Sequence, residues 1–328
     1  MGQAEENPLR GVRVLDGGLA TELEFLGADL SGPLWSAHVL EQQPRLVAAV
    51  HEAYLAAGAE CIATASYQVS RRGFAELGLP PERADAALLR AVELAVGARD
   101  AHLRSAAASL TASSQSGASL RPLVAASLGP FGAALHNGAE YHGNYDCSWD
   151  ELVEFHRERI AVLATSSGAD RADLIAFETV PSLAEAEAIV AALSDWPEVR
   201  AWISFTTSLT ANSARCVAHG EPLGDCAEVL AAHPQVVGIG LNCLAPRLVL
   251  PLIGELRAAC ELPIVVYPNS GENWDASARC WTGASDPQAF HTLALEWFEA
   301  GAQMVGGCCR TRPEHIRQIA AAARGQRA

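Results

Sequence analysis

Short apolar runs alternate with longer amphipathic stretches along most of this chain. Each run is rich in β-branched or other apolar residues, ends in small or polar ones, and is too short for a helix, which is typical of buried strands. We expect strands at residues 12–17, 61–66, 123–129, 174–179, 201–206, 236–243, 263–269 and 304–309. The alanine- and leucine-rich stretches between them predict helices at residues 44–57, 81–101, 149–167, 183–193, 224–232, 247–260, 287–300 and 313–324, with Ser148 and Ser182 as plausible N-caps.

This alternation predicts one α/β domain over residues 1–328, folded as a closed parallel (β/α)₈ TIM barrel. The rival is an open doubly wound sheet, which normally carries a glycine-rich phosphate turn after its first strand. The turn at Asp16-Gly17-Gly18 does not complete that pattern. Residues 105–119 are rich in Ala and Ser without apolar periodicity, so we expect a flexible surface insertion there rather than a domain boundary.

Composition and charge restrict the class of protein. Half of the residues are hydrophobic, which is enough for a large core, and the net charge is −15 from 38 acidic and 23 basic residues. Such an acidic surface repels phosphate backbones and anionic lipid, so we expect neither a nucleic acid nor a membrane partner. The nine cysteines are odd in number and the chain starts without a signal-peptide pattern, which together favour a reducing, cytoplasmic location over a disulfide framework. The pattern does not specify an oligomeric state.

Three cysteines fall at the carboxyl ends of predicted strands. Cys243 ends the sixth, and Cys308 and Cys309 end the eighth after two glycines. The carboxyl ends of barrel strands meet at one mouth, so these thiolates can share one ion, and soft sulfur ligands suit Zn²⁺. Three protein ligands leave an open position, as in catalytic zinc sites. The alternative, buried small hydrophobes, is retained for the other six cysteines.

Two carboxylates join this predicted mouth. Asp16 and Glu178 end the first and fourth strands, where they can grip the ammonium group of an amino acid; helix capping or a surface ion pair is the alternative. Backbone N–H groups around Gly17 and the hydroxyl of Thr64 can take the carboxylate of the same ligand. Three thiolates leave bound Zn²⁺ with a net negative charge, which suits activation of a thiol better than hydrolysis by water.

The chain resembles the homocysteine S-methyltransferase family over nearly its full length. The similarity is carried by eight short segments in order, at residues 16–21, 64–68, 129–133, 140–145, 178–181, 240–243, 267–272 and 306–311. The resemblance implies a zinc barrel with Cys243, Cys308 and Cys309 as ligands. It also implies that Asp16 and Glu178 hold the amino group of homocysteine, with Gly17 and Thr64 near its carboxylate.

The resemblance further implies the reaction. The segment 140–145 is most similar to compact members that use S-methylmethionine, with S-adenosylmethionine as a secondary donor. The sulfonium is already an activated leaving group, so no general acid is expected. Four aromatic residues are candidates for contact with that cation, or else for ordinary packing: Tyr67, Tyr141, Tyr145 and Trp274. The alternatives are selenocysteine or another small thiol as acceptor, betaine as donor, and, in a different class, a zinc or redox sensor.

Overall fold

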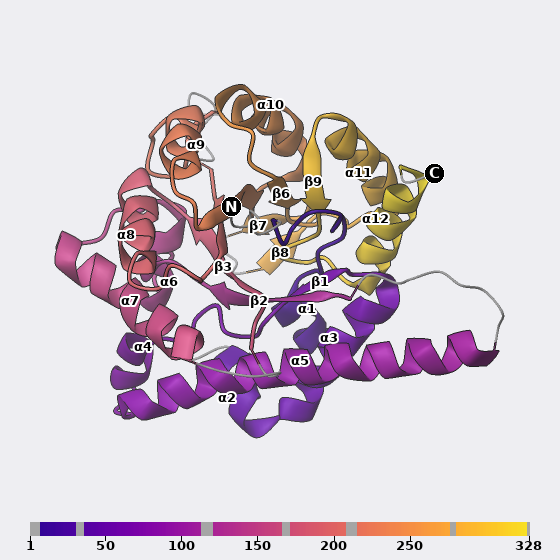
Figure 1. The fold of residues 1–328 in the computed structure, drawn as a ribbon, viewed down its shortest axis with the longest axis horizontal. Coiled ribbons are helices and arrows are strands. Elements are labelled where there is room, and N and C mark those ends of the chain that lie inside the picture. Colours follow the sequence, from indigo (N-terminus) through magenta and orange to yellow (C-terminus); the bar gives the residue numbers. More distant parts are fainter. Residues whose placement is uncertain are drawn as a thin grey trace, which may run out of the picture.

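The computed structural model describes residues 7–30, 36–112, 121–165, 171–207, 215–275 and 280–326. Its centre is a curved sheet of seven parallel strands in the order β1-β2-β3-β4-β5-β6-β9 (Figure 1). The strands are β1 (Cys61–Ala63), β2 (Leu123–Leu128), β3 (Leu174–Val180), β4 (Ala201–Phe205), β5 (Val236–Asn242), β6 (Ile264–Tyr267) and β9 (Ala302–Val305). Seven of the predicted strands are therefore confirmed, and all of them point the same way.

The first predicted strand, at residues 12–17, is not an extended ladder. Val14 forms a single parallel bridge with Val305 of β9, and Leu15 forms one with Cys61 of β1. This segment thus lies between the two edge strands of the sheet and contacts both. The fold is an α/β fold with a seven-stranded parallel sheet, and the expected eighth strand is reduced to these two bridges.

Helices surround the sheet on its outer side (Figure 1). Each contacts the next along the chain, and the last, α12, contacts the first of the series, α3. The series comprises α3 (Pro44–Ala57), α5 (Pro81–Ala112), α7 (Trp149–Thr165), α8 (Leu183–Leu193), α9 (Leu223–Ala231), α10 (Val249–Ala259), α11 (Ala289–Glu299) and α12 (Pro313–Gly325). The two predicted N-caps are confirmed: the Oγ atoms of Ser148 and Ser182 accept hydrogen bonds from the third residue beyond each.

Several details differ from the sequence-based expectation. Helix α5 continues to Ala112, so residues 105–112 are helical and not a flexible insertion, while residues 113–120 lie outside the described residues. Alanine has the highest helix propensity, which offsets the missing apolar periodicity. Unpredicted short elements also occur: α1 (Leu19–Phe25), α2 (Ser36–Gln42), α4 (Arg71–Ala75), α6 (Phe131–Ala134), η1 (Ala139–Tyr141), η3 (Pro246–Leu248) and the hairpin of β7 (Asn273–Asp275) with β8 (Cys280–Thr282). Among the described helices none is long and apolar enough to cross a membrane.

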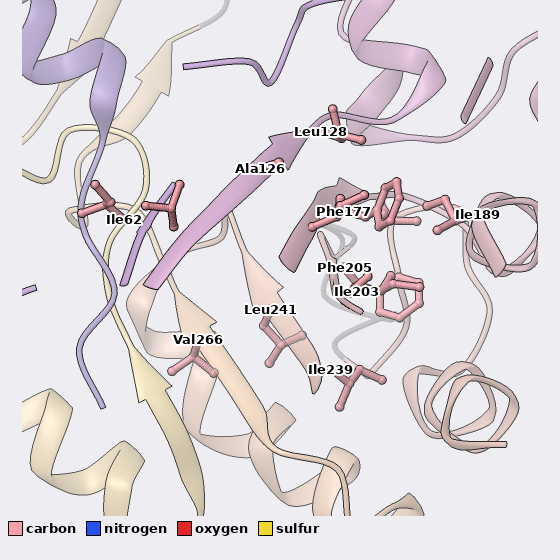
Figure 2. Close-up of a cluster of buried hydrophobic side chains, with 14 of the residues drawn as sticks. Ile62, Ala126, Leu128, Phe177, Ile189, Ile203, Phe205, Ile239, Leu241 and Val266 are labelled. Atoms are coloured by element: carbon pink, nitrogen blue, oxygen red, sulfur yellow. The ribbon is translucent and has the colours of Figure 1, made fainter. Parts of the chain in front are cut away.

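The core has two layers because successive side chains of a strand point to opposite faces of the sheet. The larger layer fills the space between sheet and helices; Figure 2 shows Ile62, Ala126, Phe177 and Ile203 from the strands, and Ile189 from α8. The smaller layer lies inside the curve of the sheet and includes Leu15, Ala125, Trp202 and Met304. This filled interior supports the strand ends, where the polar residues of the candidate site begin.

Candidate active site

A cavity of about 560 Å³ opens at the carboxyl ends of the parallel strands. This volume is within the range of about 300–1,000 Å³ that is usual for small-molecule sites. Its lining comes from the segments that follow nearly every strand, so residues far apart in the sequence meet there. It includes all the predicted metal and homocysteine residues: Asp16, Gly17, Thr64, Glu178, Cys243, Cys308 and Cys309.

The three cysteines form one cluster in this wall. The Sγ atom of Cys309 lies 3.8 Å from that of Cys243 and 4.0 Å from that of Cys308, and all three atoms lie within 4.8 Å of one another. A tetrahedral ion with zinc–sulfur bonds of about 2.3 Å places its sulfur ligands about 3.8 Å apart. The donor set and its spacing therefore fit Zn²⁺ or a similar thiophilic ion.

The backbone around the cluster is held in an uncommon conformation. Cys243 has φ +55°, in the left-handed region that non-glycine residues rarely adopt. The backbone N–H of Cys309 donates to Oδ1 of Asn269 over 3.1 Å, which fixes the loop after β9. Hydrogen bonds from the thiols of Cys308 and Cys309 lower the pKa of Cys243 well below its usual value. The cluster is thus preorganised for at least one thiolate.

Two glycines let the first segment approach the cysteine loop. A Cβ atom on Gly18 would lie 2.4 Å from the carbonyl oxygen of Cys308, and one on Gly306 would lie 2.6 Å from that of Asp16. Any larger residue at these positions would separate the two backbones. The contact brings Asp16 to the same mouth as the cysteines.

Asp16 and Glu178 are buried carboxyl groups that share this mouth. The Oδ2 atom of Asp16 accepts from the backbone N–H of Ala63 over 2.9 Å, and Glu178 accepts from the hydroxyl of Ser127. Burial raises the pKa of Asp16 well above its usual value, and the charge of Glu178 raises it further. Burial also raises the pKa of Glu178 to about 7. Two neighbouring buried carboxyl groups are each costly to ionise, so they are suited to a cationic ligand.

Thr64 is at the predicted place, but its hydroxyl is already engaged. The Oγ1 atom accepts from the backbone N–H of Ser127 over 3.0 Å and lies 2.6 Å from Oγ of Ser66. Because the Ser66 hydroxyl donates to the carbonyl of Ser127, the Thr64 hydroxyl is the donor in the Thr64–Ser66 bond. The sequence analysis expected this hydroxyl to bind a ligand carboxylate. In the structure its proton is instead donated to Ser66.

The four aromatic candidates have different positions. Tyr67 and Tyr141 line the cavity, and the hydroxyl of Tyr141 lies 3.5 Å from Sγ of Cys243. Tyr145 instead packs against Phe131, with ring centroids 5.3 Å apart, and its hydroxyl donates to Glu185. The side chain of Trp274 falls outside the described residues; its backbone belongs to β7.

Glu185 is the centre of a second buried polar cluster, behind the cavity wall. Its carboxylate accepts from the backbone N–H of Phe131, from Tyr145 and from Nε2 of His156, the last over 3.0 Å. Arg159 donates to Nδ1 of His156 over 2.9 Å and to the carbonyl of Gly129 over 2.9 Å. This cluster ties helices α7 and α8 to the loop that carries Tyr141.

Sequence reasoning did not assign several polar residues of the cavity, and four of them bear on the site. Ser127 holds Glu178, Asn242 bonds both the backbone N–H and the hydroxyl of Thr179, and Gln68 and Glu140 lie in the lining. The signal for Asn242 was its place directly before Cys243 at a strand end. Gln68 and Glu140 lie in loops beyond their strands, where no periodicity indicates the direction of a side chain.

Fold and site together define an α/β protein with a cluster of three cysteines and two buried carboxyl groups in one cavity, and comparison with known proteins identifies its enzyme class. The family model described as homocysteine S-methyltransferase matches residues 13–323. Homocysteine S-methyltransferase YbgG of Bacillus subtilis is 44% identical over 95% of this chain and 94% of its own, and the enzyme of Escherichia coli is 41% identical over 97% and 99%. The metallated form of the homocysteine methyltransferase MmuM from Escherichia coli superposes with a TM-score of 0.78, at 39% identity over 97% of this chain and 96% of that one.

The chain therefore belongs to the homocysteine S-methyltransferase family.

Proposed function

We propose that this protein transfers a methyl group from S-methylmethionine to the thiol of L-homocysteine, with S-adenosylmethionine as a secondary donor. The observation that carries the proposal is the meeting of three thiols and two buried carboxyl groups in one cavity of about 560 Å³. The related enzymes named above are homocysteine methyltransferases, which supports homocysteine as the acceptor.

Asp16 and Glu178 bind the ammonium group of homocysteine in this proposal. Both are buried, and no arginine or histidine of the described residues is among the groups that shift the pKa of either one. A cationic ligand offsets the cost of ionising two neighbouring buried carboxyl groups. Because the Thr64 hydroxyl is engaged with Ser66, backbone N–H groups near Gly17 and Thr64 bind the substrate carboxylate.

Cys243, Cys308 and Cys309 hold Zn²⁺ in this proposal. The ion supplies a means of keeping the acceptor sulfur deprotonated and nucleophilic at neutral pH. Their sulfur spacing of 3.8–4.0 Å supports the assignment. A site of three reduced thiols requires a reducing compartment, so we infer a cytoplasmic enzyme.

The transfer itself balances without a general acid. The bond between the donor sulfonium and its methyl carbon breaks as a bond from the homocysteine sulfur to that carbon forms. The thiol proton goes to solvent, and the sulfonium and the thiolate become two neutral thioethers. What the protein provides is proximity and alignment, with the rings of Tyr67 and Tyr141 facing the cation.

We also infer that the chain folds as a closed (β/α)₈ barrel in which residues 12–17 form the first strand. In this view residues 1–328 form a single domain. The bridges Val14–Val305 and Leu15–Cys61 support this closure, as does the contact between α12 and α3.

The test is a donor comparison with the metal-loaded protein. Homocysteine is incubated in turn with S-methylmethionine, S-adenosylmethionine and betaine, and methionine is measured. We expect the highest kcat/KM with S-methylmethionine and a lower one with S-adenosylmethionine. A preference for betaine, or transfer to selenocysteine in preference to homocysteine, would contradict the proposal.

A further inference from the structure

Two buried oxygen atoms of the cavity have no hydrogen-bond partner among the described residues. They are Oε1 of Gln68 and Oε2 of Glu140, and both residues line the cavity that holds the cysteines. Buried polar atoms are nearly always paired, so an unpaired one in a cavity marks a place for a ligand. Both atoms are acceptors, so the ligand group must be a donor.

These two residues come from different segments than Asp16 and Glu178, the pair that holds homocysteine in the proposed function. Gln68 follows β1, and Glu140 lies in the short helix η1 that also carries Tyr141. The neighbouring Tyr141 hydroxyl is 3.5 Å from Sγ of Cys243.

A positive charge beside Glu140 would offset the cost of ionising its buried oxygen. Burial raises the pKa of this carboxyl group to about 7. Close packing fixes its backbone, since a Cβ on Gly132 would lie 2.5 Å from the backbone nitrogen of Glu140. A primary ammonium group is cationic and carries three N–H donors, so it can supply a donor to each of these oxygens.

We propose that Gln68 and Glu140 form the subsite for the α-ammonium group of the methyl donor, so that the enzyme selects sulfonium donors that are amino acids. This inference rests on the proposed function, and it assigns Gln68 and Glu140 to binding of the methyl donor in the same cavity. S-Methylmethionine and S-adenosylmethionine both carry the ammonium group. Betaine and simple dimethylsulfonium carboxylates do not, and they would leave both oxygens unpaired.

The test uses Glu140→Gln in the metal-loaded enzyme with two donors, S-methylmethionine and dimethylsulfoniopropionate, which has a sulfonium but no amino group. Loss of one charge-assisted bond changes binding by roughly 10- to 100-fold. We expect KM for S-methylmethionine to rise by that factor, with KM for homocysteine, kcat and KM for dimethylsulfoniopropionate changed by less than about threefold. Gln68→Leu is expected to act on the same KM by roughly 3- to 10-fold.

The matched control is Glu52→Gln, which removes the same charge from an exposed residue outside the cavity lining. It should leave both donor KM values unchanged. Calorimetric titration of S-methylmethionine into the protein with homoserine in place of homocysteine gives a second readout that needs no turnover. Wild-type protein should bind the donor, and Glu140→Gln should bind it at least about tenfold more weakly.

Three outcomes would overturn the inference while leaving the proposed transfer intact. Equal KM increases for both donors would show that Glu140 acts on the sulfonium instead. An increase in KM for homocysteine alone would place Glu140 in the acceptor site. Unchanged donor binding in both Glu140→Gln and Gln68→Leu would remove the subsite altogether. Absence of methyl transfer in the wild type would instead reject the proposed function. The calorimetric comparison of donor binding by wild type and Glu140→Gln would then still test the subsite, because it requires no turnover.

Discussion

Glu185 is fully buried and Glu140 is partly buried with one buried oxygen, and the two glutamates have opposite surroundings. Burial raises the pKa of both, to about 7 for Glu140 and about 8 for Glu185. Glu185 accepts bonds from Phe131, Tyr145 and His156, whereas one oxygen of Glu140 has no partner among the described residues. A buried carboxylate whose oxygens accept hydrogen bonds from several segments stabilises the fold. A carboxylate with an unpaired oxygen in a cavity is available to bind a ligand. Substitutions should therefore divide into those that cost activity and those that cost stability.

The largest expected effect belongs to the cavity side of this comparison. Cys308→Ser should lose bound metal and lower methyl transfer by at least about 1,000-fold, beyond the roughly 10- to 100-fold typical of residues that only support a metal ligand. Metal analysis and methionine formation measure the two losses. The control is Cys147→Ser, a partly buried cysteine outside the cluster. Loss of metal without loss of transfer would contradict a catalytic role for the ion.

Glu185→Leu tests the other side. It leaves the backbone N–H of Phe131, the hydroxyl of Tyr145 and the ring of His156 without their acceptor, so we expect the free energy of unfolding to fall by about 3–5 kcal/mol. Urea unfolding gives this value. Glu187→Leu, at an exposed position of the same helix, should change it by less than about 0.5 kcal/mol. A Glu185→Leu variant that is as stable as the wild type but inactive would contradict this prediction, because it would show that Glu185 contributes to catalysis.

Asp16→Asn should affect substrate binding with little effect on the fold. The amide oxygen still accepts from Ala63, but the charge for the homocysteine ammonium group is gone. We expect KM for homocysteine to rise by roughly 10- to 100-fold. Steady-state kinetics with a saturating donor checks this, with exposed Asp150→Asn as the control. If only the KM for the donor increased, Asp16 would bind the donor instead of homocysteine, which would contradict its assigned role.

His51 extends the comparison because it is buried, lies outside the cavity lining and has no hydrogen-bond partner in the described part of the chain. Burial lowers the pKa of His51 to about 4, so the unfolded state binds its proton first as the pH falls. The contribution of neutral His51 is complete above about pH 6.5 and is lost progressively as the pH falls toward 4. Between pH 7 and pH 5 this loss is about 2 kcal/mol, and His51→Met should remove it.

The measurement is urea unfolding of both proteins at the two pH values. Partly exposed His102→Met serves as the control and should keep the pH dependence of the wild type. An identical pH dependence in wild type and His51→Met would mean that His51 finds a hydrogen-bond partner in solution.

Strand ends were the part of the site that the sequence could specify. Cys243, Cys308 and Cys309 follow short apolar runs, and parallel strands bring their carboxyl ends together, so the cluster followed from the order of elements. The roles of Thr64 and Tyr145 did not follow, because Ser66 and Glu185 compete for their hydroxyl groups. Such partners are decided by tertiary packing, which no local pattern reports.

For the fold, the sequence predicted the long amphipathic helices well and the short strands less well. Helices α3 and α8 have the bounds that their apolar periodicity indicated, because both are amphipathic and bounded by clear signals. The first strand is less regular than predicted: of residues 12–17, Val14 and Leu15 form isolated bridges, and Arg13 and Asp16 add backbone hydrogen bonds to Val305 and Cys61. The hairpin of β7 and β8 has three residues in each strand, too few for a period-two pattern to stand out.

The bridge between Val14 and Val305 has a consequence for biosynthesis. During translation Asp16 emerges early, but Cys308 and the Thr311 atoms that bind the backbone N–H of Gly18 emerge almost 300 residues later. A nascent chain therefore carries Asp16 for most of its synthesis without Cys308 and Cys309, which complete the cavity. The cysteine cluster proposed to hold the metal is complete only once Cys309 has been added, so its assembly is a late event of synthesis or follows release.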